Sequence, residues 1–298
     1  MEYRFPGICN PRPPAGAKGR PYGIIPPMTR ICLTPQATTG GPASFQARLA
    51  DGLARRGIQV CHDPDEPCDA ILVNGGTRRL DLLWRARRRG VRIVQRLNGM
   101  NWLHRLRRTG LRHFLRAEYG NRVLAVIRSR LADGIVYQSE FSRQWWEQRR
   151  GPAPVPGRVI HNGVDLAAFT PDGPGEPPAD RFRLLLVEGN LGGGYESGLE
   201  VALRLAGLLS EGFPVELMVA GRVSPTLQAG VAARSPVPVV WAGLVPREGI
   251  PALDRSAHLL YSADINPACP NAVIEALACG LPVLAFDTGA LPELVTGD

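Results

Sequence analysis

Long apolar runs are absent from this sequence. No stretch of its 298 residues approaches the roughly 20 apolar residues that a helix needs to cross a bilayer. The N-terminus also lacks the apolar core of a signal peptide. We therefore expect a cytoplasmic protein that is either soluble or peripheral on the cytoplasmic face of a membrane.

Cysteines in the spacing of a metal site are absent as well. The six cysteines are Cys9, Cys32, Cys61, Cys68, Cys269 and Cys279. Several lie inside apolar strand or helix patterns, and none of the spacings resembles a zinc site. We therefore expect reduced thiols and no metal site.

Lysine is almost missing. Lys18 is the only one among 35 lysine and arginine residues, so arginine carries the net charge of +8. Such a bias reports genome composition and does not by itself indicate a function.

The distribution of arginine is more informative than its number. Residues 78–130 contain many arginines but only two acidic residues, Asp81 and Glu118. A basic helix face beside Trp84 and Trp102 suits an anionic membrane surface or a phosphate-bearing acceptor. A merely solvated basic surface is the simplest interpretation, and nucleic acid is the least favoured partner. No nucleic acid is therefore expected.

Short apolar runs alternate with amphipathic segments along most of the chain. Residues 1–27, rich in Pro, Gly and Arg, are expected to be disordered. Expected strands are 30–34, 57–61, 69–73, 91–96, 134–138, 158–161, 182–187, 214–220, 237–241, 258–261 and 282–286. Expected helices are 43–56, 78–90, 105–130, 140–149, 196–210, 225–233, 247–256 and 271–279. This alternation predicts parallel sheets that are covered by helices on both faces.

A Pro- and Gly-rich linker interrupts this alternation. It occupies residues 171–181 and separates an N-terminal Rossmann-like domain at 28–170 from a second one at 182–298. The chain is long enough for two such domains with separate cores. We therefore predict an α/β protein in which two Rossmann-like domains face each other across a cleft.

The stretch from Asn271 to Ala285 is the most informative part of the sequence. Asn271 is a good N-cap residue, and Pro270 blocks helix before it. Gly280 lies where a helix stops. Glu275 is the one carboxylate among the small apolar residues of this short helix, and an unpaired buried carboxylate is costly. Sugar hydroxyls are suitable partners for it, although a surface position on an ordinary amphipathic helix is the alternative.

Residues 262–287 resemble the donor-site signature of GT-B, family 4-type glycosyltransferases (glycosyl transferases group 1). Three more segments are similar to this family in the same order: Thr39-Gly40-Gly41-Pro42 before a helix, Asn162-Gly163-Val164-Asp165 with Phe169 and Pro171 after it, and Leu184 to Gly189 before a glycine loop. Together they cover residues 30–298. The family pattern continues beyond Glu293 with further elements, so the resemblance implies a C-terminally truncated second domain.

The resemblance implies transfer of a sugar from a nucleotide-diphosphate sugar to a saccharide, lipid or small-molecule acceptor by a hexosyltransferase-like enzyme. Retention of configuration and independence from metal are implied by the resemblance alone, and no cofactor is expected. The expected donor-binding residues are Gly189, Asn190, Gly192, Gly193, Gly194, Arg222, Cys269, Pro270, Asn271, Ala272 and Glu275. Among them Arg222, at the end of a strand, is a substitute for the family's clamp cation, with an ordinary surface arginine as the alternative. The expected acceptor-side residues are Gly40 and Gly41, together with Arg96 and Asn98 at the carboxyl end of a strand. Within these sets Glu275 would bind the ribose, and the glycine loop and Arg222 would bind the diphosphate.

Two departures from the family pattern keep alternatives open. Asn190 stands where the family places an arginine, and no Arg or Lys occurs between Leu184 and Leu203. The carboxylate expected eight residues before Glu275 is replaced by Pro267. A degenerate, non-catalytic protein that binds a sugar nucleotide or a partner is therefore one alternative, and a basic peripheral membrane module is another.

Overall fold

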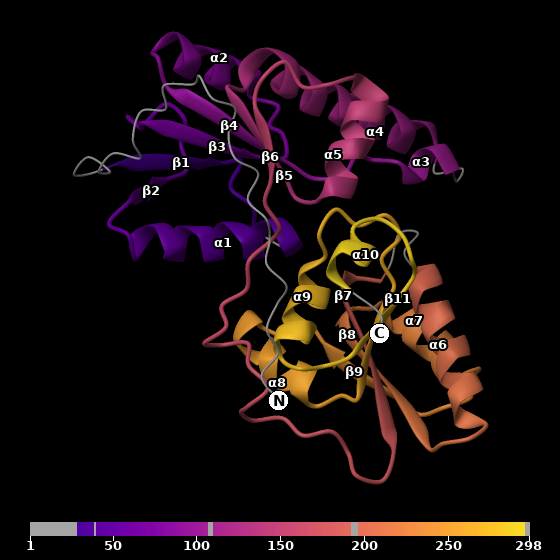
Figure 1. Ribbon diagram of the computed structural model, residues 1–298. Helices are drawn as coiled ribbons and strands as arrows, with labels where there is room; N and C mark the ends of the chain where they lie inside the picture. The colour runs from indigo at the N-terminus through magenta and orange to yellow at the C-terminus, as the bar shows by residue number, and fades with distance from the viewer. Residues whose placement is uncertain (1–28, 39, 107–109, 192–195, 296–298) are drawn as a thin grey trace, which may run out of the picture.

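The computed structural model describes residues 29–38, 40–106, 110–191 and 196–295. The disorder expected for residues 1–27 and the proposed phosphate-binding residues Gly192, Gly193 and Gly194 fall outside these ranges. Two parallel β-sheets, one of six strands and one of five, lie in two separate domains (Figure 1). The predicted α/β class is confirmed.

The N-terminal domain is built on the six-stranded sheet, in the order β2-β1-β3-β4-β5-β6. Its strands are β1 (Arg30–Thr34), β2 (Gln59–Cys61), β3 (Ala70–Asn74), β4 (Arg92–Leu97), β5 (Gly134–Tyr137) and β6 (Gly157–Val159). Its helices are α1 (Gly40–Ala54), α2 (Leu80–Arg88), α3 (Leu103–Leu106), α4 (Leu111–Val126), the π-helical turn η1 (Ile127–Leu131) and α5 (Glu140–Arg150). All five strand pairs are parallel.

The C-terminal domain is built on the five-stranded sheet, in the order β11-β10-β7-β8-β9. Its strands are β7 (Phe182–Asn190), β8 (Val215–Arg222), β9 (Val239–Gly243), β10 (Leu259–Ser262) and β11 (Val283–Ala285). Its helices are α6 (Glu196–Ser210), α7 (Pro225–Ala232), the 3-10 turn η2 (Arg247–Gly249), α8 (Ile250–Arg255), α9 (Asn271–Ala278) and α10 (Leu291–Leu294).

Apolar side chains on both faces of each sheet form the cores. In the C-terminal domain, Leu186 and Leu217 pack with α6 on one face, and Leu185 and Leu260 pack with α9 on the other. Parallel strands that are buried on both faces read as continuous apolar runs, which is why the sequence located nearly all of them. The prediction of one continuous helix at 105–130 is wrong. A separate helix, α4, begins at Leu111, and its N-cap residue is Gly110 with φ 85°. Within the described residues no helix combines the length and apolarity required to span a bilayer.

The strand order gives each sheet one switch point. In the N-terminal sheet the connections diverge between β1 and β3, and in the C-terminal sheet they diverge between β7 and β10. Ligands of open α/β sheets bind beyond the carboxyl ends of the strands at such switch points. The α1 helix of the first domain faces α9 of the second there, and α10 lies below α5 (Figure 1).

Candidate active site

A cavity of about 450 Å³ lies between the two domains and is called the interdomain cavity below. The N-terminal domain lines it with Gly41, Arg96, Asn98 and Gln138, among others. The C-terminal domain lines it with Glu188 and Gly189 at the end of β7, and with residues 266–272 and Asp264 after β10. The cavity therefore lies between the switch point of the C-terminal sheet and the carboxyl ends of β4, β5 and β6 in the N-terminal sheet.

The predicted donor loop, Cys269 to Ala272, forms one wall of this cavity. Pro270 precedes α9 in an extended conformation, with ψ 121°, so the helix begins at Asn271 beside the cavity. The first N–H groups of a helix have no partner within it and carry the positive end of the helix dipole. The start of α9 is therefore suited to an anionic or polyhydroxylated ligand.

Asn162, between β6 and β7, joins the donor loop to the N-terminal domain. Its Nδ2 donates to the Cys269 carbonyl and to Asn271 Oδ1, both at 2.9 Å, and its Oδ1 accepts from Arg96. Its backbone N–H donates to Cys269 Sγ at 3.3 Å. The side chain of Asn162 is thus a polar bridge between the two walls of the cavity.

Arg96 supplies the cationic charge of the cavity. Arg96 lies near the carboxyl end of β4 and is only 4% exposed. Its guanidinium lies 3.6 Å from the centre of the Phe45 ring. Its Nη1 donates to Asn74 Oδ1 at 2.8 Å and to Asn98 Oδ1 at 3.4 Å. Burial lowers the pKa of Arg96 to about 10, so it stays protonated at neutral pH.

Glu188 and Asp264 place two carboxylates on the opposite wall. Glu188 lies near the carboxyl end of β7 and Asp264 follows β10, and these two strands are adjacent and parallel. Burial, with the Asp264 charge nearby, raises the pKa of Glu188 to about 8, and burial also raises the pKa of Asp264. A pair of carboxylates in this state holds one proton readily, so it can both accept and donate hydrogen bonds.

Glu275 is buried between the domains, but it is not among the residues that line the interdomain cavity. Its Oε1 lies 3.0 Å from Nη2 of Arg48 on α1, and the residue is 8% exposed. Burial raises the pKa of Glu275, although the charges of Arg48 and Arg247 oppose this shift. Arg48 also donates to Ser44 Oγ and to the Gly163 carbonyl, which fixes its guanidinium. Ribose binding by Glu275 stays a prediction, and it requires Arg48 to share this carboxylate.

The other predicted site residues fall into two groups. Gly41 and Asn98 line the cavity on the acceptor side, and Gly40, with φ 71°, precedes them at the start of α1. Asn190 and Arg222 are exposed, pair with each other across β7 and β8, and do not line the cavity. The diphosphate role predicted for Arg222 therefore remains a prediction without a cavity contact behind it.

The fold brings four residues to the site or its border that the sequence analysis does not place there. They are Asn162, Glu188, Asp264 and Arg48. Glu188 and Asp264 could have been found from the rule that switch-point strands carry functional side chains at their carboxyl ends. No sequence pattern indicates a role for Arg48, because its partner Glu275 lies in the other domain, far away in the sequence.

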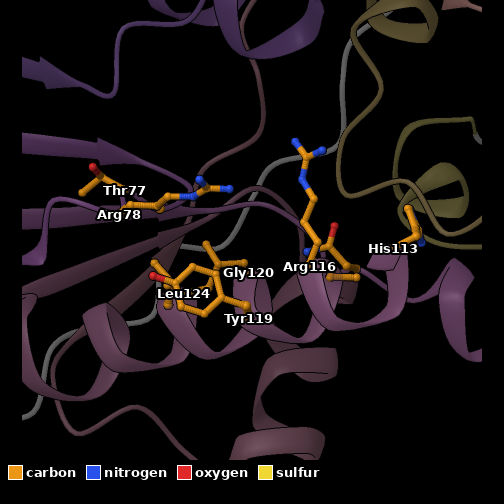
Figure 2. A pocket seen from close by; sticks show the side chains of 11 residues that line it. Thr77, Arg78, His113, Arg116, Tyr119, Gly120 and Leu124 are labelled. Atoms are coloured by element: carbon orange, nitrogen blue, oxygen red, sulfur yellow. The ribbon is translucent and has the colours of Figure 1, made fainter. Parts of the chain in front are cut away.

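A second cavity, of about 380 Å³, opens beside the first in the N-terminal domain. Figure 2 shows Thr77 and Arg78, which follow β3, together with His113, Arg116, Tyr119 and Leu124 of α4. None of its described lining residues is acidic. Asn98 to Met100 line the interdomain cavity and Asn101 lines the second one, so the two cavities adjoin along this segment.

Comparison with solved structures gives the architecture. Sucrose-phosphate synthase from Thermosynechococcus elongatus is similar with a TM-score of 0.67 and 16% identity, over 88% of this chain and 82% of that chain. A glycosyltransferase from Rickettsia africae is similar with a TM-score of 0.61 and 13% identity, over 91% of this chain and 82% of that chain. A TarM variant from S. aureus, in complex with fondaparinux, alpha-GlcNAc-glycerol and UDP, is similar with a TM-score of 0.56 and 13% identity. The match covers 77% of this chain and 43% of that chain. This chain has the GT-B glycosyltransferase fold.

The sequence of the C-terminal domain also matches a glycosyltransferase family. Residues 183–298 match the family described as Glycosyl transferases group 1. This is the family that the motif resemblance named, and the resemblance is confirmed for residues 183–298. No curated protein sequence matches the chain. The structural similarity establishes the fold of this chain. Because the sequence identities are low, its substrates have to be inferred from the site.

Proposed function

We propose that this protein is a hexosyltransferase-like glycosyltransferase that moves a sugar from a nucleotide-diphosphate sugar to a saccharide or lipid-linked acceptor. The observation that carries the proposal is the interdomain cavity, where the start of α9, an arginine and a carboxylate pair converge beyond the carboxyl ends of strands of both sheets. Departure of a nucleoside diphosphate requires stabilisation of developing negative charge, and fixed dipoles and cations provide it. Retention of configuration and independence from metal are part of the proposal.

The donor is proposed to lie with its ribose toward Glu275 and its sugar toward Glu188 and Asp264. Glu275 lies one helical turn after Asn271, which lines the cavity, so a nucleotide at the start of α9 can extend toward it. A carboxylate accepts hydrogen bonds from two adjacent hydroxyls. Glu188 and Asp264 stand in the place of the missing family carboxylate at position 267, where they can bind sugar hydroxyls.

The acceptor is proposed to occupy the second cavity. Its basic, acid-free lining suits an acceptor that carries a phosphate or carboxylate group, and the segment 98–101 leads from it to the donor. Arg78→Gln is expected to raise the KM for such an acceptor on the order of tenfold with kcat nearly unchanged, because a contact made equally in ground and transition states is lost. An unchanged KM would remove this placement.

Turnover and binding together test the main proposal. Nucleotide-sugar donors with different bases and sugars are screened by thermal shift, since a ligand bound only by the native state raises Tm. Hydrolysis or transfer is then measured with the donors that bind, with and without EDTA. Binding with no turnover across donors and acceptors supports the degenerate, non-catalytic alternative, and absence of any nucleotide binding refutes the donor-site assignment.

The exposed face of α4 supports peripheral attachment to an anionic membrane. Leu111 is 74% exposed, Leu115 is 59% exposed and Phe114 is 40% exposed, and Arg112 and Arg122 are exposed on the same helix. Apolar side chains flanked by arginines are typical of interfacial helices. We propose a cytoplasmic protein that meets the membrane through α4, which would bring the second cavity close to a lipid-linked acceptor.

Vesicle sedimentation tests this attachment. Wild-type protein should sediment with vesicles that contain anionic lipid at low salt, and less with neutral vesicles or at high salt. Leu115→Gln should weaken sedimentation, while Leu208→Gln, which alters a leucine of α6 that is 67% exposed, serves as the matched control. Equal sedimentation of both variants and wild type would contradict a role for α4.

A further inference from the structure

Arg96 is a buried cation that has no anionic partner in the described part of the chain. It forms no ion pair there, and its hydrogen bonds go to the neutral side-chain oxygens of Asn74, Asn98 and Asn162. The other charged or ionisable groups that act on it are Cys269 and Arg48. A buried charge without a counter-charge is costly, so a fold retains it where something else repays the cost.

A second buried arginine in the same domain shows that burial alone does not make a binding site. Arg128 is 2% exposed and donates to the carbonyl of Gly151, which ends α5, at 2.7 Å, and to the Tyr137 hydroxyl at 3.3 Å. The end of a helix is the negative end of its dipole, so Arg128 has a structural partner. Arg96 has no such partner and lines the interdomain cavity instead.

The geometry around Arg96 leaves donors for a ligand. A guanidinium has five N–H groups, and three hydrogen bonds are made by Arg96 to protein. The three asparagine oxygens and the Phe45 ring hold the planar group in one orientation. Guanidinium groups bind phosphate oxygens through paired N–H donors, and a preorganised fork does so with little loss of entropy.

We propose that Arg96 is the residue that binds a phosphoryl group in the interdomain cavity, in the role that the family gives to cations of the C-terminal domain. The phosphoryl group comes either from the diphosphate of the donor or from a phosphorylated acceptor. The assignment to the donor rests on the proposed function, whereas the phosphoryl site itself does not. Across the cavity from Arg96, the start of α9 adds backbone N–H groups to the same ligand.

Calorimetric titration of the full chain tests this proposal with four probes. Inorganic phosphate, inorganic pyrophosphate, uridine and UDP are titrated into wild type, Arg96→Gln, Arg96→Lys and Arg128→Gln, and guanosine and GDP repeat the series for a second base. Loss of a charge-assisted contact is expected to weaken pyrophosphate binding on the order of 10- to 100-fold in Arg96→Gln. Arg96→Lys should restore part of this loss, and Arg128→Gln should bind like wild type despite a lower Tm.

The outcomes separate the sources of the phosphoryl group. If the donor supplies it, the affinity gain of UDP or GDP over its nucleoside disappears in Arg96→Gln. If a phosphorylated acceptor supplies it, nucleotide affinities stay unchanged, but inorganic phosphate no longer binds to the nucleotide-saturated variant.

Failure of the proposed function looks different from failure of this site. Pyrophosphate binding that depends on Arg96, in a protein that binds no nucleotide, supports the site and refutes the donor assignment. Equal binding of all probes by wild type and Arg96→Gln overturns the proposal, as does a wild-type protein that binds none of the phosphoryl probes. A ligand-free Arg96→Gln protein should be at least as stable as wild type, because a buried charge without a counter-charge has been removed, and its folding is therefore checked first by Tm.

Discussion

The N-terminal wall of the interdomain cavity carries a cation among amides, whereas the C-terminal wall carries carboxylates. Arg96 is the only arginine or lysine among the described lining residues, and Glu188 and Asp264 are the only acids. In the family that the sequence resembles, the C-terminal wall holds the phosphate-clamping cations. Here the distribution is the opposite. A diphosphate at the start of α9 would be neutralised by Arg96 of the N-terminal domain, so diphosphate binding should depend on both domains being close together.

Contacts between the domains already hold the walls together. Arg48 pairs with Glu275 at 3.0 Å, and Glu293 of α10 accepts hydrogen bonds from the backbone N–H groups of Glu140 and Phe141 at the start of α5. The second contact places a carboxylate at the positive end of a helix dipole. The C-terminal domain therefore has two sets of acids: Glu188 and Asp264 line the cavity, whereas Glu275 and Glu293 contact the other domain.

The largest effect is expected when the Arg48–Glu275 pair is broken. Glu275→Ala leaves the Arg48 guanidinium buried without its partner, which should lower the free energy of unfolding by about 3 kcal/mol. Nucleotide affinity should fall as well, if Glu275 binds the ribose. Urea denaturation and nucleotide titration measure the two effects.

The double variant Arg48→Ala/Glu275→Ala separates them. A double-mutant cycle should show that Arg48→Ala and Glu275→Ala are not additive in stability, because the second change removes a charge that was already unpaired. Nucleotide binding that survives in both Glu275→Ala and the double variant would remove the ribose role and leave Glu275 as an interdomain ion-pair partner.

Removing the cavity-facing charge of Glu188 should produce a smaller effect that depends on pH. Its folded pKa of about 8 lies above the ordinary glutamate pKa of 4.5, so the folded state binds more protons between these pH values than the unfolded state does. Wild-type stability should therefore fall as pH rises from about 4.5 to about 8, and Glu188→Gln should lack this component. Above pH 8 the variant should be more stable by on the order of 1 to 2 kcal/mol, with partial exposure of the group taken into account.

Tm measured from pH 4 to pH 9 tests this sign. Asp254, whose pKa burial and Glu275 also raise to about 8, contributes the same slope to both proteins. The difference between them therefore isolates the Glu188–Asp264 pair, because the charge of one carboxylate acts on the pKa of the other. Parallel curves for wild type and Glu188→Gln would mean that the carboxylate is not desolvated in solution.

The strands and helices were largely predictable, because each depends on local patterns. Leu184 to Val187 read as a buried strand, and Pro270 with Asn271 read as a helix start, from residues adjacent in sequence. The charges of the cleft walls were not predictable in this way. Arg96 becomes a lone buried cation only because Asn74 and Asn162, which are distant in sequence, occupy its donors. The ion pair of Glu275 likewise depends on how the two domains meet.

Glu293 offers a weaker test of the interdomain contacts. Burial raises its pKa, but hydrogen bonds from Phe141 N–H, His161 and Glu140 N–H outweigh this, so the folded pKa is lowered. Glu293→Gln should therefore cost about 1 kcal/mol at neutral pH. Because a lowered carboxyl pKa stabilises the fold only above it, the Tm values of variant and wild type should converge as pH falls below about 4. A constant difference in acid would contradict a charge-based contact.

The smallest effect is expected at Arg222, and it decides which wall binds phosphate. Arg222 is exposed at the end of β8, and its carbonyl accepts a hydrogen bond from Leu191 N–H at 3.0 Å. Its side chain has no hydrogen-bond or ion-pair partner in the described part of the chain. Arg222→Ala should therefore change stability by less than about 0.5 kcal/mol, as surface substitutions do. Calorimetric titration with UDP should show less than about a twofold change, since an exposed charge contributes little. A loss as large as that expected for Arg96→Gln would instead place the diphosphate against the loop beyond β7, and the charge of the C-terminal wall would then have to be reconsidered with Arg222 as its clamp.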